Sequence, residues 1–418
     1  MIKVNDINVP QLRFNEFDAE WKQKEVPELI AHHKGAMKIG PFGSQLKKDT
    51  FVKKGFKVYG QENIFIDDFN FGDRFITEEH FNRLKTNEIY PDDFVVSTMG
   101  TIGRCTVVPV GIERGIMDSH MIRLQLNENV ITPDFLAQLF GSFKMLKQVK
   151  RLSVGGIMDG LSIGIMKELK FQVPNIPEQQ KIAQFLTAVD SKLQQLNQKK
   201  ELLAQYKKGV MQQLFSQQLR FKQDNGSDYP DWEEKRLGEI ADRISTKNTS
   251  NEVNFVLTNS ATQGVVSQQE YFDKEIANQN NLEGYYIVSK DDFVYNPRIS
   301  ASAPVGPIKR NKLQKGVMSP LYSIFRFKES LLEYFEHYFE TTNWHKYLHS
   351  VANFGARHDR MNITNSDFFK MPIPMPTYDE RKKIANYLSA IDSKIETVTQ
   401  QIEATQQFKK GLLQQMFV

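Results

Sequence analysis

The sequence predicts a mixed α/β (α+β) protein in which two β-rich domains are joined by two long antiparallel coiled-coil helices. Three observations lead to this fold class. A long stretch occurs twice, each copy has the periodicity of a coiled coil, and short strand-like runs fill the regions between the copies. At 418 residues the chain has room for roughly two to three domains with their own cores.

The repeated stretch covers residues 174–215 and 376–417, which align without a gap at an offset of 202. Identical pairs are Glu178 and Glu380, Asp190 and Asp392, Lys207 and Lys409, and Gly209 and Gly411. The repeat extends outside this stretch, because Leu12-Arg13-Phe14 with Trp21 recurs as Leu219-Arg220-Phe221 with Trp232, and Asp92-Asp93-Phe94-Val95 recurs as Asp291-Asp292-Phe293-Val294. The chain therefore contains one structural unit twice, and an antiparallel pair of helices would give it a pseudo-two-fold axis.

Each copy of the stretch is predicted to be a single long helix. Asn175 and Thr377 stand three residues before Glu178 and Glu380, which is the spacing of a capping box. No proline interrupts either copy after its first turn. Some forty residues in helical conformation span roughly 60 Å.

Apolar residues recur along both helices with the alternating four-and-three spacing of a coiled-coil seam. The two seams begin Ile182, Leu186, Val189, Leu193, Leu196 and Ile384, Leu388, Ile391, Ile395, Val398. The remaining positions are rich in Gln, Lys and Glu, which suit water better than a surrounding core. We therefore expect the two seams to pack on each other; the alternative is that each helix packs only on its own domain.

These features divide the chain into six parts. They are an N-terminal segment at 1–20, a first domain at 21–173, a first helix at 174–215, a connector at 216–231, a second domain at 232–375 and a second helix at 376–418. Strands are expected at Phe56–Tyr59, Phe94–Ser97, Thr106–Val110, Met121–Leu126, Tyr285–Val288, Phe293–Asn296, Gly306–Lys309 and Tyr322–Phe327. Helical spacing predicts one segment near the end of each domain, at Pro133–Arg151 and Leu331–Val351.

Composition limits the class of protein. The net charge of +4 permits a nucleic-acid partner but does not establish one. The single cysteine, Cys105, excludes an internal disulfide and fits a reducing compartment. No apolar run has the length of a signal peptide core or a membrane span. We therefore expect a soluble, cytoplasmic protein that is not bound to a membrane.

Patterns typical of catalysis are incomplete in this sequence. The glycines of residues 40–48 lack the Gly-Lys-Ser/Thr ending of a phosphate-binding loop. Asn296-Pro297 lacks the second proline and aromatic residue of a methyltransferase loop, and the carboxylates and lysine of 231–235 are contiguous in a connector. His345 and His349 lack the glutamate of a zinc-protease helix. We predict no catalytic and no metal-binding residues, and no cofactor bound by this chain.

Two similar but diverged domains on a pair of stiff helices suit a double-stranded DNA partner. Domains about 34 Å apart would enter successive major grooves on one face of a duplex. Because the loops differ between the two halves, we expect the two half-sites to differ in sequence.

Several motifs of the sequence resemble those of a known family. The pattern Pro-x-x-Pro-Glu-Gln-Gln-Lys-Ile-Ala at residues 174–183, followed by a Gln-rich heptad helix and present twice, is similar to the helical regions of the DNA-specificity subunit of type I restriction–modification systems. Residues 92–104 and Gly155-Gly156-Ile157 resemble that family's target-recognition domain. In the second half, residues 296–306 and Phe354–Arg357 depart from those motifs.

This resemblance implies a non-catalytic subunit that recognises an asymmetric bipartite DNA site. It implies two methyltransferase (modification) subunits as partners, which carry S-adenosylmethionine and methylate adenine at N6. It also implies restriction/translocase subunits, which use ATP and Mg²⁺. The helices would set the gap between half-sites and dock the methyltransferases.

Candidate DNA-binding residues are polar and basic side chains in loops beside the matched motifs. In the first domain they are Ser44, Gln45, Lys47, Lys48, Gln61, Asn63, Ser97, Thr98, Thr101, Arg104, Ser119 and His120. In the second domain they are Asn259, Ser260, Gln263, Asn296, Arg298, Ser300, Ser302, Lys309, Arg310, Ser319, Arg357, His358 and Arg360. Lys207, Lys208, Lys409 and Lys410 either face DNA or lay their stems along the seam as heptad residues.

Two other classes of function stay open from the sequence. One is a coiled-coil scaffold that joins two protein-binding domains without nucleic acid. The other is a fused DNA methyltransferase or nuclease. Salt-dependent duplex binding would favour the DNA-specificity hypothesis over the first, and S-adenosylmethionine binding by the isolated chain would favour the second.

Overall fold

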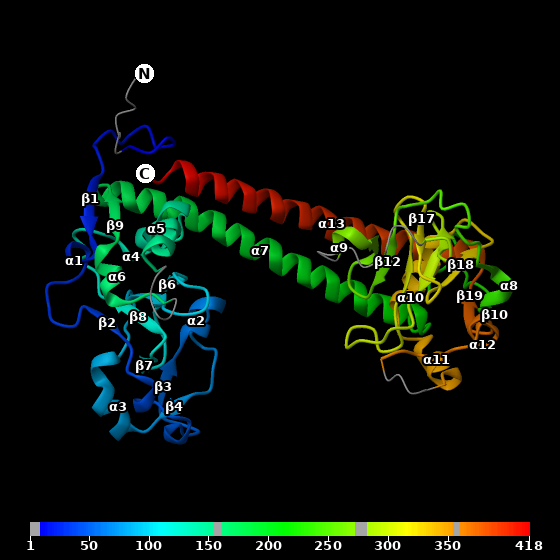
Figure 1. The fold of residues 1–418 in the computed structure, drawn as a ribbon, viewed down its shortest axis with the longest axis horizontal. Helices are drawn as coiled ribbons and strands as arrows, with labels where there is room; N and C mark the ends of the chain where they lie inside the picture. The colour runs from blue at the N-terminus through cyan, green and yellow to red at the C-terminus, as the bar shows by residue number, and fades with distance from the viewer. Residues whose placement is uncertain (1–8, 154–159, 272–281, 354–358) are drawn as a thin grey trace. The chain divides into compact units, whose positions relative to one another are not determined.

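The computed structural model describes residues 9–153, 160–271, 282–353 and 359–418. The chain forms two compact units (Figure 1). The first unit consists of Met1–Asn197 with Gln400–Val418, and the second consists of Gln198–Thr399. In the described part of the chain, no helix combines the length and the apolar composition needed to cross a membrane.

The first unit is a β-rich domain with short helices. Its strands are β1 (Lys22–Glu25), β2 (Met37–Ile39), β3 (Phe56–Tyr59), β4 (Phe75–Ile76), β5 (Phe94–Ser97), β6 (Cys105–Val107), β7 (Gly115–Met117), β8 (Met121–Leu124) and β9 (Lys170–Val173). Its short helices are α1 (Val26–Leu29), α2 (Gln61–Ile66), α3 (Glu78–Leu84), α4 (Pro133–Phe140), α5 (Phe143–Ser153) and α6 (Ile163–Glu168), with 3-10 turns η1 (Gly43–Gln45), η2 (Lys48–Thr50) and η3 (Lys85–Asn87).

Three sheets build this unit. An antiparallel sheet has the order β2-β8-β5-β6, and a smaller sheet β4-β3-β7 contains one parallel pair, β3 with β7. Strand β1 pairs antiparallel with β9, so the strand that enters the domain lies beside the strand that leads into the long helix.

The second unit repeats this plan with different detail. Its strands are β10 (Glu233–Arg236), β11 (Ala241–Ile244), β12 (Leu257–Ser260), β13 (Gly264–Ser267), β14 (Tyr286–Val288), β15 (Phe293–Tyr295), β16 (Ile308–Arg310), β17 (Gly316–Met318), β18 (Ser323–Phe327) and β19 (Pro372–Met375). Its short helices are α8 (Leu237–Ile240), α9 (Gln268–Tyr271), α10 (Leu332–Glu340), α11 (His345–Val351) and α12 (Asn365–Phe369). The sheet β11-β18-β15-β16 matches β2-β8-β5-β6, and β10 pairs with β19 as β1 does with β9.

The aspartates of the repeated Asp-Asp-Phe-Val motif explain why this sheet is repeated. In the first unit the carboxylate of Asp93, before β5, lies 3.9 Å from the guanidinium of Arg123 on β8. In the second unit Asp292 accepts two hydrogen bonds from Arg326 on β18, at 2.7 and 3.1 Å. Both aspartates are buried, so each motif fixes one strand to its neighbour by charge as well as by backbone pairing.

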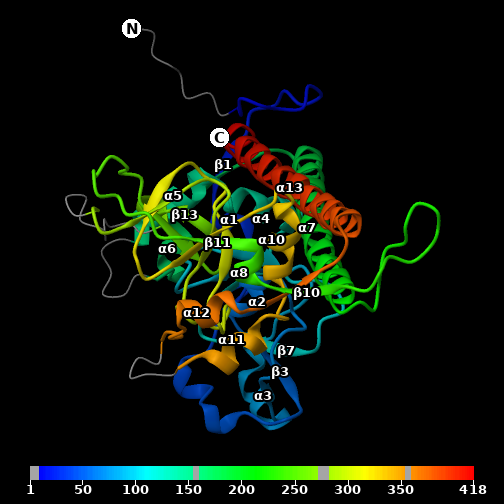
Figure 2. The same ribbon diagram turned by 90° about the vertical axis from the view of Figure 1, so that its right-hand side faces the viewer.

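The two predicted long helices are α7 (Ile176–Phe215, 40 residues) and α13 (Tyr378–Gln415, 38 residues). Residues up to Asn197 of α7 lie in the first unit together with the end of α13, while the rest of both helices lies in the second. In each unit the helices lie side by side and run in opposite directions (Figure 1, Figure 2). Asp190 meets Lys409 at 2.5 Å in the first unit, and Lys207 meets Asp392 at 2.7 Å in the second.

The end of each long helix completes a domain core. In the first unit Leu412, Met416 and Phe417 join the same apolar cluster as Trp21 and Phe135. In the second unit Phe215, the counterpart of Phe417, packs against Trp232, Tyr334 and Tyr338 with ring centroids 5.5 to 6.5 Å apart. The prediction of two β-rich domains with paired antiparallel helices is confirmed, and the alternative of helices that pack only on their own domain is wrong.

A buried ionic cluster stands at the start of each long helix. Glu178 accepts two hydrogen bonds of 2.7 Å from Arg13 and one of 3.2 Å from Trp21. Glu380 accepts bonds of 3.0 and 2.9 Å from Arg220 and one of 3.0 Å from Trp232. The repeated Leu-Arg-Phe and Trp of the sequence are thus the partners of the repeated glutamate.

This cluster corrects the predicted capping boxes. The backbone N–H groups of Glu178 and Glu380 do donate to the side chains of Asn175 and Thr377, at 3.0 and 3.4 Å. The two carboxylates, however, bind the Arg of the segment before each domain and the Trp at the domain's first residue. Only half of each capping box is formed, because the charge-assisted bonds to arginine are the stronger ones.

Two predicted segments are interrupted. Pro133–Arg151 is split into α4 and α5 at Gly141-Ser142, where Ser142 Oγ accepts a hydrogen bond from the N–H of Met145. Leu331–Val351 is split into α10 and α11, where Thr341 Oγ1 donates to the carbonyl of Tyr338. In each case a hydroxyl takes over a backbone partner and ends the helical ladder.

We predict that Arg220→Met destabilises the second unit by about 3 kcal/mol, because Glu380 is fully buried and would lose the charge that compensates it. Adding Glu380→Gln should restore part of the loss, because no buried charge then remains. Urea unfolding of the full chain measures both effects.

The control is Lys222→Met, which removes an ion pair of 3.9 Å whose side chains are 66% and 84% exposed. It should cost less than about 1 kcal/mol. Equal losses for Arg220→Met and Lys222→Met would contradict a structural role of the buried cluster.

Candidate nucleic-acid interface

The first group of predicted residues lies on the turns η1 and η2. Ser44, Gln45, Lys47 and Lys48 are all exposed. The carbonyl oxygen of Gln45 lies 2.8 Å from Nε2 of His80, which fixes the turn to α3. The structure therefore holds this turn in place and leaves its four predicted side chains at the surface.

Two further lysines extend this basic turn. Lys53 and Lys54 are exposed just before β3, and the sequence analysis did not include them. The sequence pattern that could have identified them is a pair of Lys-Lys dipeptides six residues apart, which places four cations on one short segment. None of the four forms an ion pair within the described residues, so their charge is available to an anionic partner.

At the end of β5 and in the loop after it, two of the predicted DNA-binding residues are buried and two are exposed. Ser97 and Thr98 are buried: Ser97 Oγ donates to the carbonyl of Thr101 at 2.8 Å, and the N–H of Thr98 donates to the carbonyl of His120 at 3.0 Å. These two residues shape the loop from inside, and their contact with DNA stays a prediction. Thr101 and Arg104 are exposed on it.

A second loop region lies around α2. Asn63 is buried, and its amide binds the N–H of Gly60 and the carbonyls of Asp68 and Phe71 at 2.9 to 3.0 Å. All of these bonds hold the loop together, and the DNA contact of Asn63 stays a prediction. Gln61, the first residue of α2, is half-buried.

Ser119 and His120 form the turn between β7 and β8. Both are half-buried. The carboxylate of Asp118 accepts a bond of 2.9 Å from the N–H of His120 and one of 3.1 Å from Arg74. This turn is thus fixed by a charged residue while its two polar side chains stay partly accessible.

A cavity of about 890 Å³ opens beside the Thr101 loop. Thr101 and Arg104 line it together with Lys150 from α5 and with Asp190 and Lys409 from the long helices. Gln138 donates to Asp190 at 2.9 Å, and Lys409 binds the other oxygen of the same carboxylate. Lys409 is therefore neutralised by the helix pair rather than free to hold a phosphate.

In the second unit the structure gathers predicted residues from three distant segments. They line one cavity of about 560 Å³ and are Asn259, Ser260, Asn296, Arg298, Ser300, Ser302 and Arg360. The segments are joined by backbone bonds, from the N–H of Ile299 to Asp359 at 3.1 Å and from the N–H of Met361 to Pro297 at 2.9 Å. Loops that differ from the first unit thus form a recessed polar surface.

Some of these residues form the wall and others the rim. Asn259 is buried and donates to the carbonyls of Val294 and Pro307, while its Oδ1 has no hydrogen-bond partner among the described residues. Ser260 is buried too, and its oxygen accepts the N–H of Gln263 at 3.3 Å. Both side chains belong to the wall of the cavity, and their contact with DNA stays a prediction.

The other five side chains around this cavity reach solvent to different degrees. Asn296 is half-buried and donates to the carbonyl of Asn259 at 2.9 Å. Arg298 is 63% exposed and Arg360 25%, and each approaches Asp359 at 3.7 to 3.9 Å. Ser300 and Ser302 are exposed. Gln263 is exposed on the neighbouring turn, whereas Lys309 and Ser319 are half-buried.

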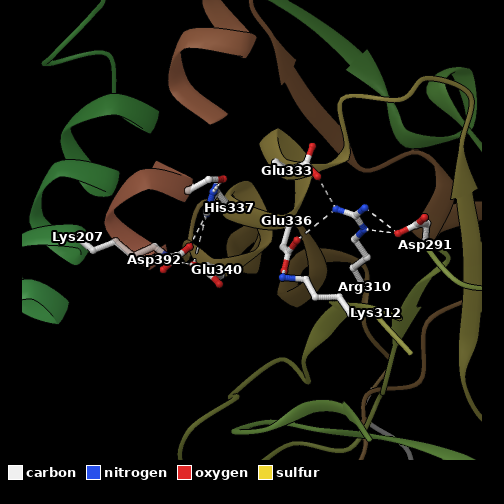
Figure 3. A network of polar contacts seen from close by, with 10 residues as sticks. Lys207, Asp291, Arg310, Lys312, Glu333, Glu336, His337, Glu340 and Asp392 are labelled. Atoms are coloured by element: carbon white, nitrogen blue, oxygen red, sulfur yellow. Dashed lines mark hydrogen bonds and ion pairs between the residues drawn. The ribbon is translucent and has the colours of Figure 1, made fainter. Parts of the chain in front are cut away.

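Arg310 is held inside the protein (Figure 3). Its guanidinium is 14% exposed and reaches Asp291 at 2.7 Å, Glu333 at 2.9 Å and Glu336 at 3.5 Å. Burial alone would lower the pKa of Arg310, but hydrogen bonds to Glu333 and Asp291 raise it. Three carboxylates already neutralise the charge of Arg310, and its DNA contact stays a prediction.

A related network joins the second domain to the long helices (Figure 3). Lys207 on α7 lies 2.7 Å from both Glu340 and Asp392 and is only 11% exposed. Nδ1 of His337 lies 3.8 Å from each of the same two carboxylates. Burial would raise the pKa of Glu340, but the His337 contact and the Lys207 charge lower it to about 2. Lys207 is thus an internal ion-pair partner rather than a DNA contact.

Two predicted residues lie outside the described part of the chain. These residues are Arg357 and His358. The motifs at 155–157 and 354–357 also lie outside the described residues. Within the described residues, no group of three or more His, Cys, Asp or Glu side chains is placed to hold a metal ion.

Known proteins resemble this chain over most of its length. The family model described as Type I restriction modification DNA specificity domain matches twice, at residues 20–205 and 229–406. Two Methanocaldococcus jannaschii proteins, described as the MjaX and MjaVIII specificity subunits of type I restriction enzymes, are similar. The first is 27% identical over 70% of this chain and 69% of its own length, and the second is 25% identical over 72% and 73%.

Solved structures share the fold. A crystal structure of a type I restriction–modification system S subunit from M. genitalium has a TM-score of 0.57 at 14% identity, over 98% of this chain and 99% of that chain. A second, from work on complex assembly and conformational transition of the type I R-M system, has a TM-score of 0.52 at 13% identity, over 94% and 96%.

We predict that Glu340→Gln weakens the second unit at neutral pH by up to about 3 kcal/mol and that this difference disappears in acid. The ordinary pKa of 4.5 is lowered to about 2 by folding. The ionised carboxylate therefore contributes stability that is complete above about pH 5 and is lost as the pH falls toward 2.

Urea midpoints of wild type and Glu340→Gln at pH 7, 5 and 3 measure this dependence. The exposed Glu283→Gln is the control, and its difference from wild type should be near zero throughout. A constant Glu340→Gln difference at all three pH values would contradict the lowered pKa.

Proposed function

The chain belongs to the family of type I restriction–modification DNA specificity subunits, and from this membership we propose that its two target-recognition domains read the two unlike halves of an interrupted DNA site. One observation carries the proposal. The four-stranded sheet and the ionic cluster are repeated in the two domains, whereas the exposed loops beside them differ. A repeated scaffold with unlike loops suits a DNA duplex, because the two half-sites have the same backbone geometry and different base sequences.

The loops differ in the groups that they offer to DNA. In the first domain the turn at Lys47 and Lys48 and the loop with Thr101 and Arg104 project cations and a hydroxyl. In the second domain the corresponding loop, Asn296–Ser302, forms the rim of a recess with Arg360. Base edges are distinguished by patterns of donors and acceptors, so loops with different groups select different half-sites.

The long helices set the number of base pairs between the half-sites in this proposal. Each helix belongs to both units, because one half completes the first domain and the other half completes the second. A continuous α-helix resists changes in length, since each residue adds a fixed 1.5 Å. Supporting this role, a buried carboxylate fixes the start of each helix to its domain.

Catalysis in this proposal belongs to partner subunits. Two methyltransferase subunits would carry S-adenosylmethionine and methylate adenine at N6, and restriction/translocase subunits would use ATP and Mg²⁺. The assembly would work in the cytoplasm, where the host DNA is.

Exposed aromatic residues at equivalent positions support two copies of one partner. Phe185 and Phe408 are 36% and 54% exposed in the first unit, and their counterparts Tyr387 and Tyr206 are 36% and 51% exposed in the second. Phe185 packs edge-on against Phe14, as Tyr387 does against Phe221. Exposed apolar surface of this kind is typical of a contact with another protein. We assign these two surfaces to the two methyltransferase subunits.

We predict that replacing residues 21–173 by the matching domain of another specificity subunit changes one half of the methylated site and leaves the other half unchanged. The gap should be unchanged as well, because α7 and α13 are retained. Methylome sequencing of a host that carries each version, with a host lacking the gene as the control, measures both halves. A change in both halves, or in neither, would contradict separate reading by the two domains.

A further inference from the structure

Helix α5 of the first domain exposes a row of positive charges that neither the predicted loops nor the helix pair uses. Lys144, Lys147, Lys150 and Arg151 are all exposed, and the helix contains no acidic residue. Its other face, with Met145, Val149 and Ser153, is buried against the domain. Within the described residues none of the four cations forms an ion pair.

Helix stability does not explain this charge pattern. Cations near the end of a helix, such as Lys150 and Arg151, interact favourably with the helix dipole. Lys144 lies in the first turn, where the dipole disfavours a cation, and Lys147 lies in the middle, where its effect is small. Lys147 and Lys150 also stand at a spacing where like charges repel. The helix dipole therefore does not account for Lys144 and Lys147. An external anion would offset the repulsion between Lys147 and Lys150.

The cations of α5 are next to the loop that carries Thr101 and Arg104. A Cβ added to Gly103 in this loop would lie 3.6 Å from the side chains of Leu146 and Val149, so α5 packs directly against it. Lys150 and Arg104 line the same cavity. The cations of α5 therefore lie beside the candidate DNA-reading loop, at a cavity that Asp67 and Asp190 also line.

The corresponding helix of the second domain lacks this surface. The buried pair Met145 and Val149 of α5 corresponds to Trp344 and Leu348 beside α11. In this register Lys147 is matched by Lys346, and the other cations Lys144, Lys150 and Arg151 are matched by Asn343, His349 and Ser350. His345, in place of Leu146, has its pKa lowered by burial and by His349. One permanent cation therefore stands where α5 has four.

We propose that α5 is a phosphate-binding surface that holds the DNA backbone against the first domain, and that α11 provides no equivalent hold in the second. The first domain then contributes more to the electrostatic binding of DNA than the second, although the two domains share one scaffold. Lysine and arginine side chains on an exposed helix contact phosphates without reading bases, so this surface positions the duplex for the Thr101 and Arg104 loop. The inference rests on the proposed function, because it takes DNA as the partner.

The salt dependence of binding tests this surface. Each phosphate neutralised by a cation contributes about 0.9 to the slope of log K against log salt. In the full chain, Lys144→Gln, Lys147→Gln, Lys150→Gln and Arg151→Gln together should lower the magnitude of that slope by about 3 to 4. The reduction should be the same on the methylated-site duplex and on a scrambled duplex of equal length, which leaves the ratio of the two affinities unchanged.

The control variant loses the same four positive charges at exposed positions of the long helices. It combines Lys192→Gln, Lys199→Gln, Lys382→Gln and Lys394→Gln. It should change the slope by less than about 1. Lys346→Gln in α11 should lower the slope by about 1 at most. Thermal unfolding of each variant establishes that the fold is retained, as expected for exposed side chains.

An unchanged slope in the α5 variant, or an equal reduction in the long-helix control, would overturn the inference. Failure of the wild-type chain to distinguish the two duplexes would instead overturn the proposed function. The two failures are separate, because the slope on the scrambled duplex still measures the contribution of α5.

Discussion

The structure of each unit depends on one buried carboxylate at the start of a long helix. Glu178 is 1% exposed and Glu380 is fully buried, so each needs the arginine that compensates it. That arginine comes from the segment before the domain, and the tryptophan that shares the carboxylate comes from the domain's first residues. An isolated buried charge costs several kcal/mol, which makes any other arrangement of these three segments unfavourable. The cluster therefore specifies the direction in which each helix leaves its domain.

From this constraint it follows that neither domain is a continuous piece of sequence. The first unit is completed by the last residues of α13, where Phe417 packs near Trp21, and the second is completed by the end of α7, where Phe215 packs near Trp232. Each tryptophan thus touches both the buried carboxylate of one helix and the terminal aromatic residue of the other. Domain and helix pair form one cooperative core, and a substitution in either helix changes the domain that it completes.

The sequence predicted the features that repeat along the chain and missed those that depend on tertiary partners. Heptads, cap positions and the offset between copies are local or periodic, so they were readable. Whether a polar side chain reaches solvent is not local. Asn63 satisfies its amide inside a loop, Asn259 on β12 donates to the carbonyls of Val294 and Pro307, and Arg310 is neutralised by Asp291 and Glu333, which stand 19 and 23 residues away. The cations of α5 were missed for the opposite reason, since they lie on a helix, whereas the predicted contacts of the two domains were residues of loops.

The same helix pair meets its two domains through different polar groups, and this difference separates scaffold from adaptation. In the first unit neutral Gln138 completes the pair of Asp190 and Lys409. In the second, His337 and Glu340 surround the pair of Asp392 and Lys207. The Asp–Lys ion pair is present in both units because it links the two helices. The side chains that surround this pair come from each domain and differ between the units. The two domains therefore differ in their loops and in the groups around this junction, while the ion pair between the helices is common to both, as expected if the spacing is fixed and the sequence recognised is free to change.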